Sequence, residues 1–164
     1  MVREILLLGD PRLYEICPEV LPEEAPNLTD AVCDLHDTLM QFRATYGAGR
    51  AIAAPQIGIQ KRLLYMCIDK PFVFINPVLT FPDDEMMEVM DDCMSFPTLY
   101  VKVLRHKRMR IDYRDMEWQE CFLELEGNLS ELLQHEADHL DGVLATMRAI
   151  DNRSYFLKGT FDKK

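Results

Sequence analysis

Residues 128–144 read NLSELLQHEADHLDGVL. The stretch places His135 and His139 four residues apart, directly after leucines at helical spacing. Because an α-helix completes one turn in about 3.6 residues, both histidines lie on one face and can hold one metal ion. Glu136 between them is a poor ligand at that offset, but it is well placed to take a proton from a metal-activated water. The pattern predicts a helix that carries two metal ligands and a base.

The flanks of this stretch support the helix. Asn128 or Ser130 is expected to cap it, and Gly142 lies near its end. Its apolar stripe comprises Leu129, Leu132, Leu133, Leu140 and Val143. Both histidines then lie beside buried surface, where Asp138 is a candidate to support the second one. The alternative is a solvated helix face that bears two chance histidines.

Length and composition indicate one domain. A chain of 164 residues with 48% apolar content can bury one sizeable core, and it contains no repeat or linker. We therefore expect a single catalytic domain over residues 1–164. The apolar run at residues 5–8 is too short for a signal peptide, and no run could span a membrane. The five cysteines lack disulfide spacing, so we expect reduced thiols and a cytoplasmic protein without membrane contact.

The charge balance disfavours a nucleic-acid partner. The net charge is −10, whereas phosphate neutralisation needs a surplus of Lys and Arg. Residues 105–110, RHKRMR, form the one basic stretch. We expect it to be a strand or hairpin edge protected by its charges, and direct nucleic-acid binding is the less favoured alternative.

The remaining chain predicts an α+β fold. A long helix is expected over residues 27–46, capped by Asn27 or Thr29 and ended by Gly47. Strands are expected at residues 62–68, 72–75, 78–81, 100–104, 109–112 and 119–125. The order of helix, short strands and helix predicts antiparallel sheets packed around the C-terminal His-Glu-x-x-His helix, with an N-terminal helix.

A catalytic metal site needs a third protein ligand. His36 and His106 have no obvious site context, whereas Cys93 lies in an expected loop, residues 90–97, with an acidic pair before the thiol. A lone cysteine is more often an inert buried residue, so ligation by Cys93 needs further support.

Three separated segments together resemble the motifs of the peptide deformylases. They are GRAIAAPQIG at residues 49–58, DDCMS at residues 91–95 and QHEADH at residues 134–139. Weaker likenesses extend over nearly the whole chain, including DPRL at residues 10–13, Asn76-Pro77, Arg105 and LDGVL at residues 140–144. Three motifs in register are far more specific than any one of them.

The resemblance implies a ligand set and a metal. Cys93, His135 and His139 are then the ligands of one divalent ion. In the family this ion is usually Fe²⁺ in the cell and is often replaced by Zn²⁺, Ni²⁺ or Co²⁺ on purification. A thiolate with two imidazoles suits Fe²⁺ or Zn²⁺ and disfavours Mg²⁺ or Ca²⁺.

The resemblance also implies a reaction, in which the formyl group of N-formyl-methionyl peptides is released as formate from nascent chains, with the ribosome as a possible setting. Glu136 takes the proton of the attacking water and hands it to the leaving amine. The side-chain amide of Gln56 and the backbone N–H of Met94 stabilise the charge that develops on the formyl oxygen.

Several residues depart from the family pattern beside the expected substrate strand. Ala51 and Asp92 replace glycines, Arg50 replaces an apolar residue, and Asp91 replaces a glutamate. Glycine is used where another backbone comes close, so Ala51 and Asp92 should narrow the groove.

A second departure concerns the pocket for the first side chain of the substrate. Glu131 and Asn128 precede His135 by four and seven residues, so they share its helix face. This wall is usually apolar in deformylases. With Asp91 and Asp92 it is expected to form a negative pocket that favours a basic or polar group. Alternatively, the helix starts later, and these residues are only its cap and first turn.

Three functions stay open at this point. The first is a deformylase of formyl-peptides or of another N-formyl compound. The second is a His-Glu-x-x-His metallopeptidase, which is disfavoured because Gln56 and Cys93 stand where deformylases need them. The third is a catalytically weak relative that binds a metal or a peptide.

Overall fold

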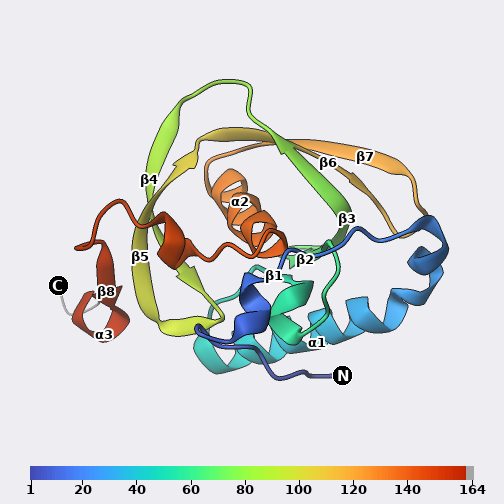
Figure 1. Ribbon diagram of the computed structural model, residues 1–164, viewed down its shortest axis with the longest axis horizontal. Helices are drawn as coiled ribbons and strands as arrows, with labels where there is room; N and C mark the ends of the chain where they lie inside the picture. The colour runs from blue at the N-terminus through green and yellow to red at the C-terminus, as the bar shows by residue number, and fades with distance from the viewer. Residues whose placement is uncertain (162–164) are drawn as a thin grey trace.

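Helix α2 (Asn128–Leu140) lies between two antiparallel sheets in the computed structural model, which describes residues 1–161 (Figure 1). The five-stranded sheet has the order β1 (Ala51–Ala53), β2 (Leu63–Cys67), β3 (Pro71–Thr80), β6 (Arg108–Arg114) and β7 (Glu120–Glu126). The three-stranded sheet has the order β4 (Met86–Cys93), β5 (Phe96–His106) and β8 (Tyr155–Leu157). This arrangement confirms the predicted α+β class.

Both faces of β1 and β2 are buried, because helices cover the sheet from two sides. Side chains alternate along a strand, so Ala51 and Ala53 join the apolar cluster of Leu132 and Leu133 on α2. Ile52 faces the opposite way, into the cluster formed with helix α1 (Thr29–Tyr46). A third cluster packs on the small sheet around Val101 and Val103. β1 is therefore held rigidly beside α2, at the edge of its sheet.

The helix boundaries confirm the predicted elements but not their caps. Leu28 occupies the N-cap of α1 and Gly127 that of α2, and neither supplies a side-chain cap. The predicted caps Asn27 or Thr29 and Asn128 or Ser130 are therefore wrong. A short 3-10 turn, Pro22–Asn27, precedes α1, and Gly47 ends α1 with a φ of 68°, as predicted. Helix α2 begins at Asn128, so the alternative of a later start is wrong, although Glu131 does lie in the first turn, as that alternative had it.

Several strands differ from the prediction. Residues 71–80 form the single strand β3 instead of two, with an irregular register at Asn76. Asn76 adopts a φ of 50°, and its side chain accepts from the backbone N–H of Val20 and donates to the carbonyl of Val20, each at 2.8 Å. β1, β4 and β8 were not predicted. β1 and β8 have only three residues each, and β4 contains residues 90–93 of the segment 90–97 that was expected to be a loop.

The basic stretch at residues 105–110 is not a sheet edge. It joins β5 to β6, and both strands have neighbours on each side in their sheets. Arg105 is buried, whereas Lys107 and Arg108 form ion pairs with Glu85 at 3.0 and 2.5 Å. The positive charges of this stretch are thus neutralised within the protein, which agrees with the argument against a nucleic-acid partner.

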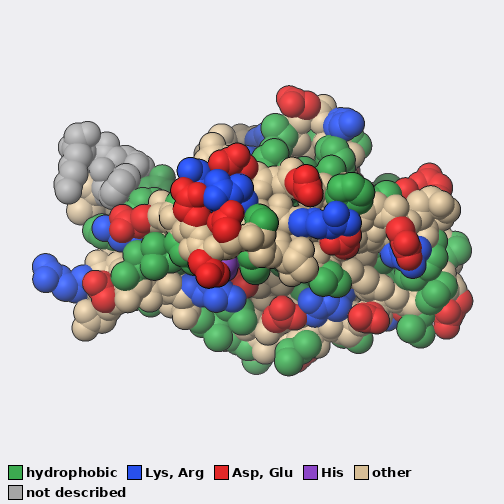
Figure 2. All heavy atoms as spheres, turned by 90° about the horizontal axis from the view of Figure 1, so that it is seen from above, with side chains coloured by type: hydrophobic (Ala, Val, Ile, Leu, Met, Phe, Trp, Pro, Cys, Tyr) green, Lys and Arg blue, Asp and Glu red, His purple; other side chains and the backbone are tan. Residues whose placement is uncertain are grey.

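On the surface, acidic and basic side chains are interspersed on the face seen in Figure 2. Within residues 1–161, none of the helices has the combination of length and apolar content needed to cross a membrane. All five cysteines are free thiols, as predicted. The predicted single domain also includes residues 162–164, which lie outside the described residues.

Candidate metal centre and active site

Helix α2 presents both histidines toward the small sheet, where Cys93 ends strand β4. One ligand atom from each of Cys93, His135 and His139 lies within 4.8 Å of the others. The Sγ atom of Cys93 is 3.3 Å from Nε2 of His139. The three residues are 6%, 5% and 1% exposed, respectively. Within residues 1–161 this is the one group of three or more His, Cys, Asp or Glu residues that could hold a metal.

A tight turn fixes the position of Cys93. β4 ends at Cys93, and β5 begins at Phe96, which pairs with Cys93 after a register shift. The backbone N–H of Ser95 donates to the Sγ of Cys93 at 3.4 Å. The segment predicted to be a loop is thus the end of a strand and a two-residue turn. This geometry holds the sulfur rigidly against α2.

The Gln56 side chain is oriented from both ends. It lies on the 3-10 helix Ala54–Ile57, directly after β1, and is 1% exposed. Its Oε1 accepts from the backbone N–H of Ala53 at 2.9 Å, so its amide nitrogen must point into the site. Nε2 donates to Sγ of Cys93 at 3.4 Å and to Oγ of Ser95 at 3.2 Å. An oriented donor of this kind can stabilise negative charge that develops beside the metal centre.

The side chain of Glu136 is buried and has a carboxylate oxygen without a hydrogen-bond partner in the part of the chain that the structure describes. It is 4% exposed, and its Oε2 has no hydrogen-bond partner among the described residues. Burial raises the pKa of Glu136 to about 7, although the neighbouring His135 acts in the opposite direction. A carboxyl group with this pKa can both accept and release a proton near neutral pH.

A buried ion-pair network supports the first histidine. Oδ1 of Asp91 lies 2.8 Å from Nδ1 of His135, and Oδ2 of Asp91 accepts from Arg105 at 2.8 Å. Burial alone would raise the pKa of Asp91, but His135 and Arg105 lower it to about 2. Asp91 was predicted to bind substrate. Although it lines the cavity, its carboxylate is committed to His135 and Arg105.

Asp138 takes part in the same network from the outer side of α2. It accepts from Arg105 at 2.5 Å and from Arg148 at 2.6 Å. The expectation that Asp138 supports the second histidine is therefore wrong, since its carboxylate points to two arginines. It contributes to the site by holding Arg105 against Asp91.

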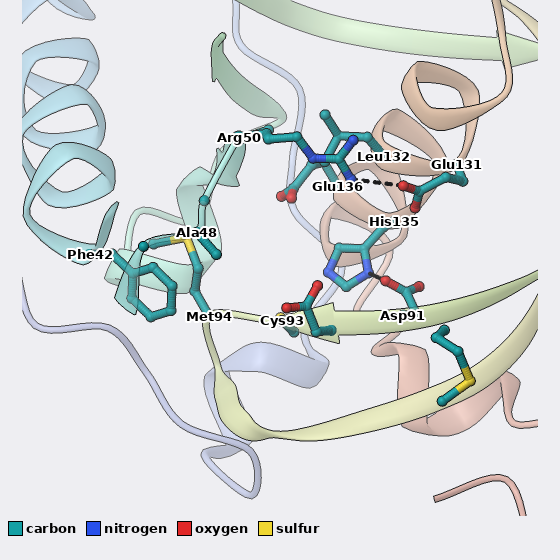
Figure 3. A pocket seen from close by; sticks show the side chains of 15 residues that line it. Phe42, Ala48, Arg50, Asp91, Cys93, Met94, Glu131, Leu132, His135 and Glu136 are labelled. Atoms are coloured by element: carbon teal, nitrogen blue, oxygen red, sulfur yellow. Dashed lines mark hydrogen bonds and ion pairs between the residues drawn. The ribbon is translucent and has the colours of Figure 1, made fainter. Parts of the chain in front are cut away.

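A cavity of about 350 Å³ opens beside these groups (Figure 3). Its lining includes the predicted site residues Arg50, Ala51, Asp91, Asp92, Cys93, Met94, Glu131, His135 and Glu136. Met94 is buried in the turn directly after Cys93. Phe42 and Leu132 add apolar surface to the lining of the cavity. The structure therefore brings together residues that are distant in sequence, and Gln56 lies just behind them, against Cys93.

The expected negative pocket is not observed, because each of the three acids expected to form it has a basic partner. Glu131 forms an ion pair with Arg50 at 2.8 Å, and Asp92 forms one with Lys158 at 2.8 Å. Asp91 is neutralised by Arg105, as described above. The cavity thus combines apolar surface with ion pairs and carries no concentrated anionic charge.

Comparison with known proteins identifies the family. The family described as "Polypeptide deformylase" matches residues 2–154, nearly the whole chain. The chain belongs to the polypeptide deformylase family. Members of this family are metal-dependent hydrolases, and the Cys93, His135 and His139 cluster agrees with a divalent metal.

Individual deformylases are similar over most of their length. The peptide deformylase of Maricaulis maris is 37% identical over 150 residues, which cover 87% of this chain and 82% of that protein. The crystal structure of peptide deformylase from Thermotoga maritima superimposes with a TM-score of 0.84 at 31% identity, covering 92% of this chain and 99% of that chain. The crystal structure of a peptide deformylase from Synechococcus elongatus in complex with actinonin has a TM-score of 0.84 at 28% identity, covering 99% of this chain and 85% of that chain.

Sequence reasoning missed three residues of this deformylase site. Ser95 accepts from Gln56, Arg105 orders Asp91, and Lys158 binds Asp92 from the end of the chain. Ser95 and Arg105 lie within or near the segments that resemble family motifs. The motifs therefore pointed to these residues but not to the contacts that they make. Lys158 is 66 positions from Asp92 and had no such signal.

Proposed function

We propose that this deformylase removes the formyl group from N-formyl-methionyl peptides, with Cys93, His135 and His139 as metal ligands and Glu136 as the proton-transferring group. The observation that carries the proposal is the buried thiol and two imidazoles beside the buried carboxylate of Glu136, whose Oε2 has no hydrogen-bond partner among the described residues. The donor set fits a borderline divalent cation, because thiolate and imidazole suit Fe²⁺ and Zn²⁺ better than Mg²⁺. We assign Fe²⁺ as the ion in the cell.

The reaction is hydrolysis of the formamide bond. A bound metal ion supplies Lewis acidity, which polarises the formyl group and makes water acidic near neutral pH. Glu136 accepts a proton from the attacking water through its free Oε2. The bond between the formyl carbon and the peptide nitrogen then breaks, and Glu136 returns the proton to that nitrogen. The products are formate and a peptide with a free amino group.

Gln56 and Met94 stabilise the charge that develops on the formyl oxygen. The Gln56 amide is already aimed into the site by its bonds to Ala53, Cys93 and Ser95. One of its two N–H donors exchanges Cys93 or Ser95 for the formyl oxygen, while the bond to Ala53 keeps the amide in position. The backbone N–H of Met94, next to Cys93 in the tight turn, is the second donor. Loss of one such donor costs about a hundred- to a thousandfold in turnover.

The edge strand β1 binds the peptide backbone. β1 has a strand neighbour on one side only, and Ala51 of β1 lines the cavity. An extended peptide can add to such an edge through backbone hydrogen bonds. Arg50, Ala51 and Glu131 then border the bound substrate, and Asp91 and Asp92 border it from the opposite strand β4. The peptides are the starts of nascent chains, met in the cytoplasm and at the ribosome.

The test is formate release from N-formyl-Met-Ala-Ser by protein loaded anaerobically with Fe²⁺. Glu136→Gln should retain the metal and lose turnover, because an amide keeps the shape of the side chain but cannot take the proton. Glu124→Gln, at an exposed position on β7, is the matched control and should retain both.

Three results would contradict the proposal. They are normal turnover by Glu136→Gln, loss of its metal, or cleavage of peptide bonds without formate. The last result would indicate a metallopeptidase. A metal held without Cys93, measured as unchanged metal content in Cys93→Ala, would refute the ligand assignment.

A further inference from the structure

An ion pair forms one wall of the active-site cavity. Arg50 directly precedes β1, and Glu131 lies on α2, one turn before His135. The Nη2 atom of Arg50 donates to Oε1 of Glu131 at 2.8 Å, as Figure 3 shows. Both residues line the cavity together with His135 and Glu136. The wall therefore presents fixed hydrogen-bonding groups close to the reacting centre.

The two partners differ in their access to water. The Glu131 side chain is 11% exposed, whereas that of Arg50 is 42% exposed. Besides Glu131, the Arg50 side chain has one long contact, from Nη1 to the carbonyl of Asn128 at 3.5 Å, and no other side-chain hydrogen bond within residues 1–161. A guanidinium group carries five N–H donors. Arg50 is thus anchored by Glu131 and still has donors available at the cavity.

The position of the cavity defines which part of a substrate meets this wall. The first side chain of a formyl-peptide is attached to the carbon next to the formamide nitrogen. It must therefore lie beside His135 and Glu136, in the cavity that these residues line. The same cavity is lined by Phe42 and Leu132, which suit an aliphatic stem. The end of that side chain then approaches the Arg50–Glu131 pair.

The chemistry of the pair selects a neutral acceptor. A purely apolar side chain would displace water from Arg50 without replacing its hydrogen bonds, which is unfavourable. An anionic end would meet Glu131, and a cationic end would compete with Arg50 for it. A neutral oxygen avoids both repulsions and accepts from the free donors of Arg50.

We propose that the Arg50–Glu131 pair makes this enzyme accept N-formyl peptides whose first side chain bears a neutral acceptor oxygen, so that N-formyl-methionine sulfoxide peptides are substrates in addition to N-formyl-methionyl peptides. The inference rests on the proposed deformylase function. Methionine sulfoxide keeps the length of methionine and adds one polar oxygen at the sulfur. The reaction on it is the same hydrolysis, with the sulfoxide unchanged.

The experiment compares three substrates that differ only in the first side chain. They are the N-formyl tripeptides X-Ala-Ser in which X is methionine, methionine sulfoxide or norleucine. In the wild type we expect kcat/KM for the sulfoxide to be within about threefold of that for methionine. In Arg50→Leu/Glu131→Leu, the ratio of kcat/KM for the sulfoxide to kcat/KM for methionine should fall by about tenfold or more, because the sulfoxide oxygen loses its hydrogen bond to a charged donor. Norleucine turnover measures any loss that the two substitutions cause for all three substrates.

The control is Lys61→Leu/Glu24→Leu, which removes a partly buried ion pair of similar length, 2.6 Å, away from the cavity. It should leave all three ratios unchanged. A wild-type sulfoxide rate more than about a hundredfold below the methionine rate, or a ratio that is the same in wild type and the Arg50/Glu131 variant, overturns the inference. Even if that variant does not fold, the ratio of kcat/KM for the sulfoxide to that for methionine in the wild type tests the inference. Absence of formate from all three substrates overturns the deformylase function itself.

Discussion

Replacement of Arg105 by methionine should destabilise the protein and weaken its metal site. Arg105 is 3% exposed and lies between Asp91, which is 5% exposed, and Asp138. Removal of one partner from a buried ion pair costs about 3–5 kcal/mol, because it leaves an uncompensated buried charge. Asp138 keeps Arg148 as a partner, whereas Asp91 keeps only His135. We therefore expect the free energy of unfolding to fall by the amount for one broken buried ion pair, and not for two.

This loss is a large fraction of the stability of a domain of this size, which is about 5–15 kcal/mol. The assay is urea unfolding at pH 7, followed by the fluorescence of the single tryptophan, Trp118. Because Asp91 would no longer be held against His135, metal affinity should also fall by about ten- to a hundredfold. Metal affinity is measured by competition with a chelator.

Arg12→Met is the matched control. Arg12 pairs with Asp10 at 2.7 Å, but the two side chains are 53% and 23% exposed. Exposed pairs contribute about 1 kcal/mol or less. If Arg105→Met loses no more free energy of unfolding than Arg12→Met, and binds metal normally, then the buried network does not support the site and the reasoning is refuted.

Three further predictions concern other groups. Because the pKa of Asp91 is lowered from 3.8 to about 2, its carboxylate stabilises the fold above pH 4 and loses that effect as the pH falls through 2. When the pH is lowered from 6 to 2, the free energy of unfolding, measured with urea, should therefore fall by about 2 kcal/mol more in the wild type than in Asp91→Asn. Cys33 is exposed, whereas burial raises the pKa of Cys17 to about 11, so mass spectrometry after brief alkylation at pH 8 should find Cys33 modified and Cys17 not; equal labelling would contradict this. Ala51→Gly should raise kcat/KM on formyl-methionyl peptides, while Asp92→Gly should change it less, since Lys158 already neutralises Asp92; a larger effect at Asp92 would refute the ranking.

Local periodicity explains what could be predicted. The spacing of His135 and His139 depends only on the pitch of a helix, so their shared face followed from the sequence. The resemblance to deformylases added Cys93 and Gln56, and the structure places Cys93 against His139 and Gln56 against Cys93. Strand β1 was missed because three residues with both faces buried show no alternation of polar and apolar side chains.

The sequence by itself determined the two helices, the α+β class and the shared face of His135 and His139 on α2, because each depends on residues a few positions apart. Only the tertiary structure decided which charges meet. Arg50 reaches Glu131 across 81 positions, and Lys158 reaches Asp92 across 66. The prediction of a negative pocket was wrong for this reason. The sequence shows which side chains are acidic, but the packing of distant segments decides which basic side chain lies beside each of them. In the folded protein these acids form ion pairs without net charge.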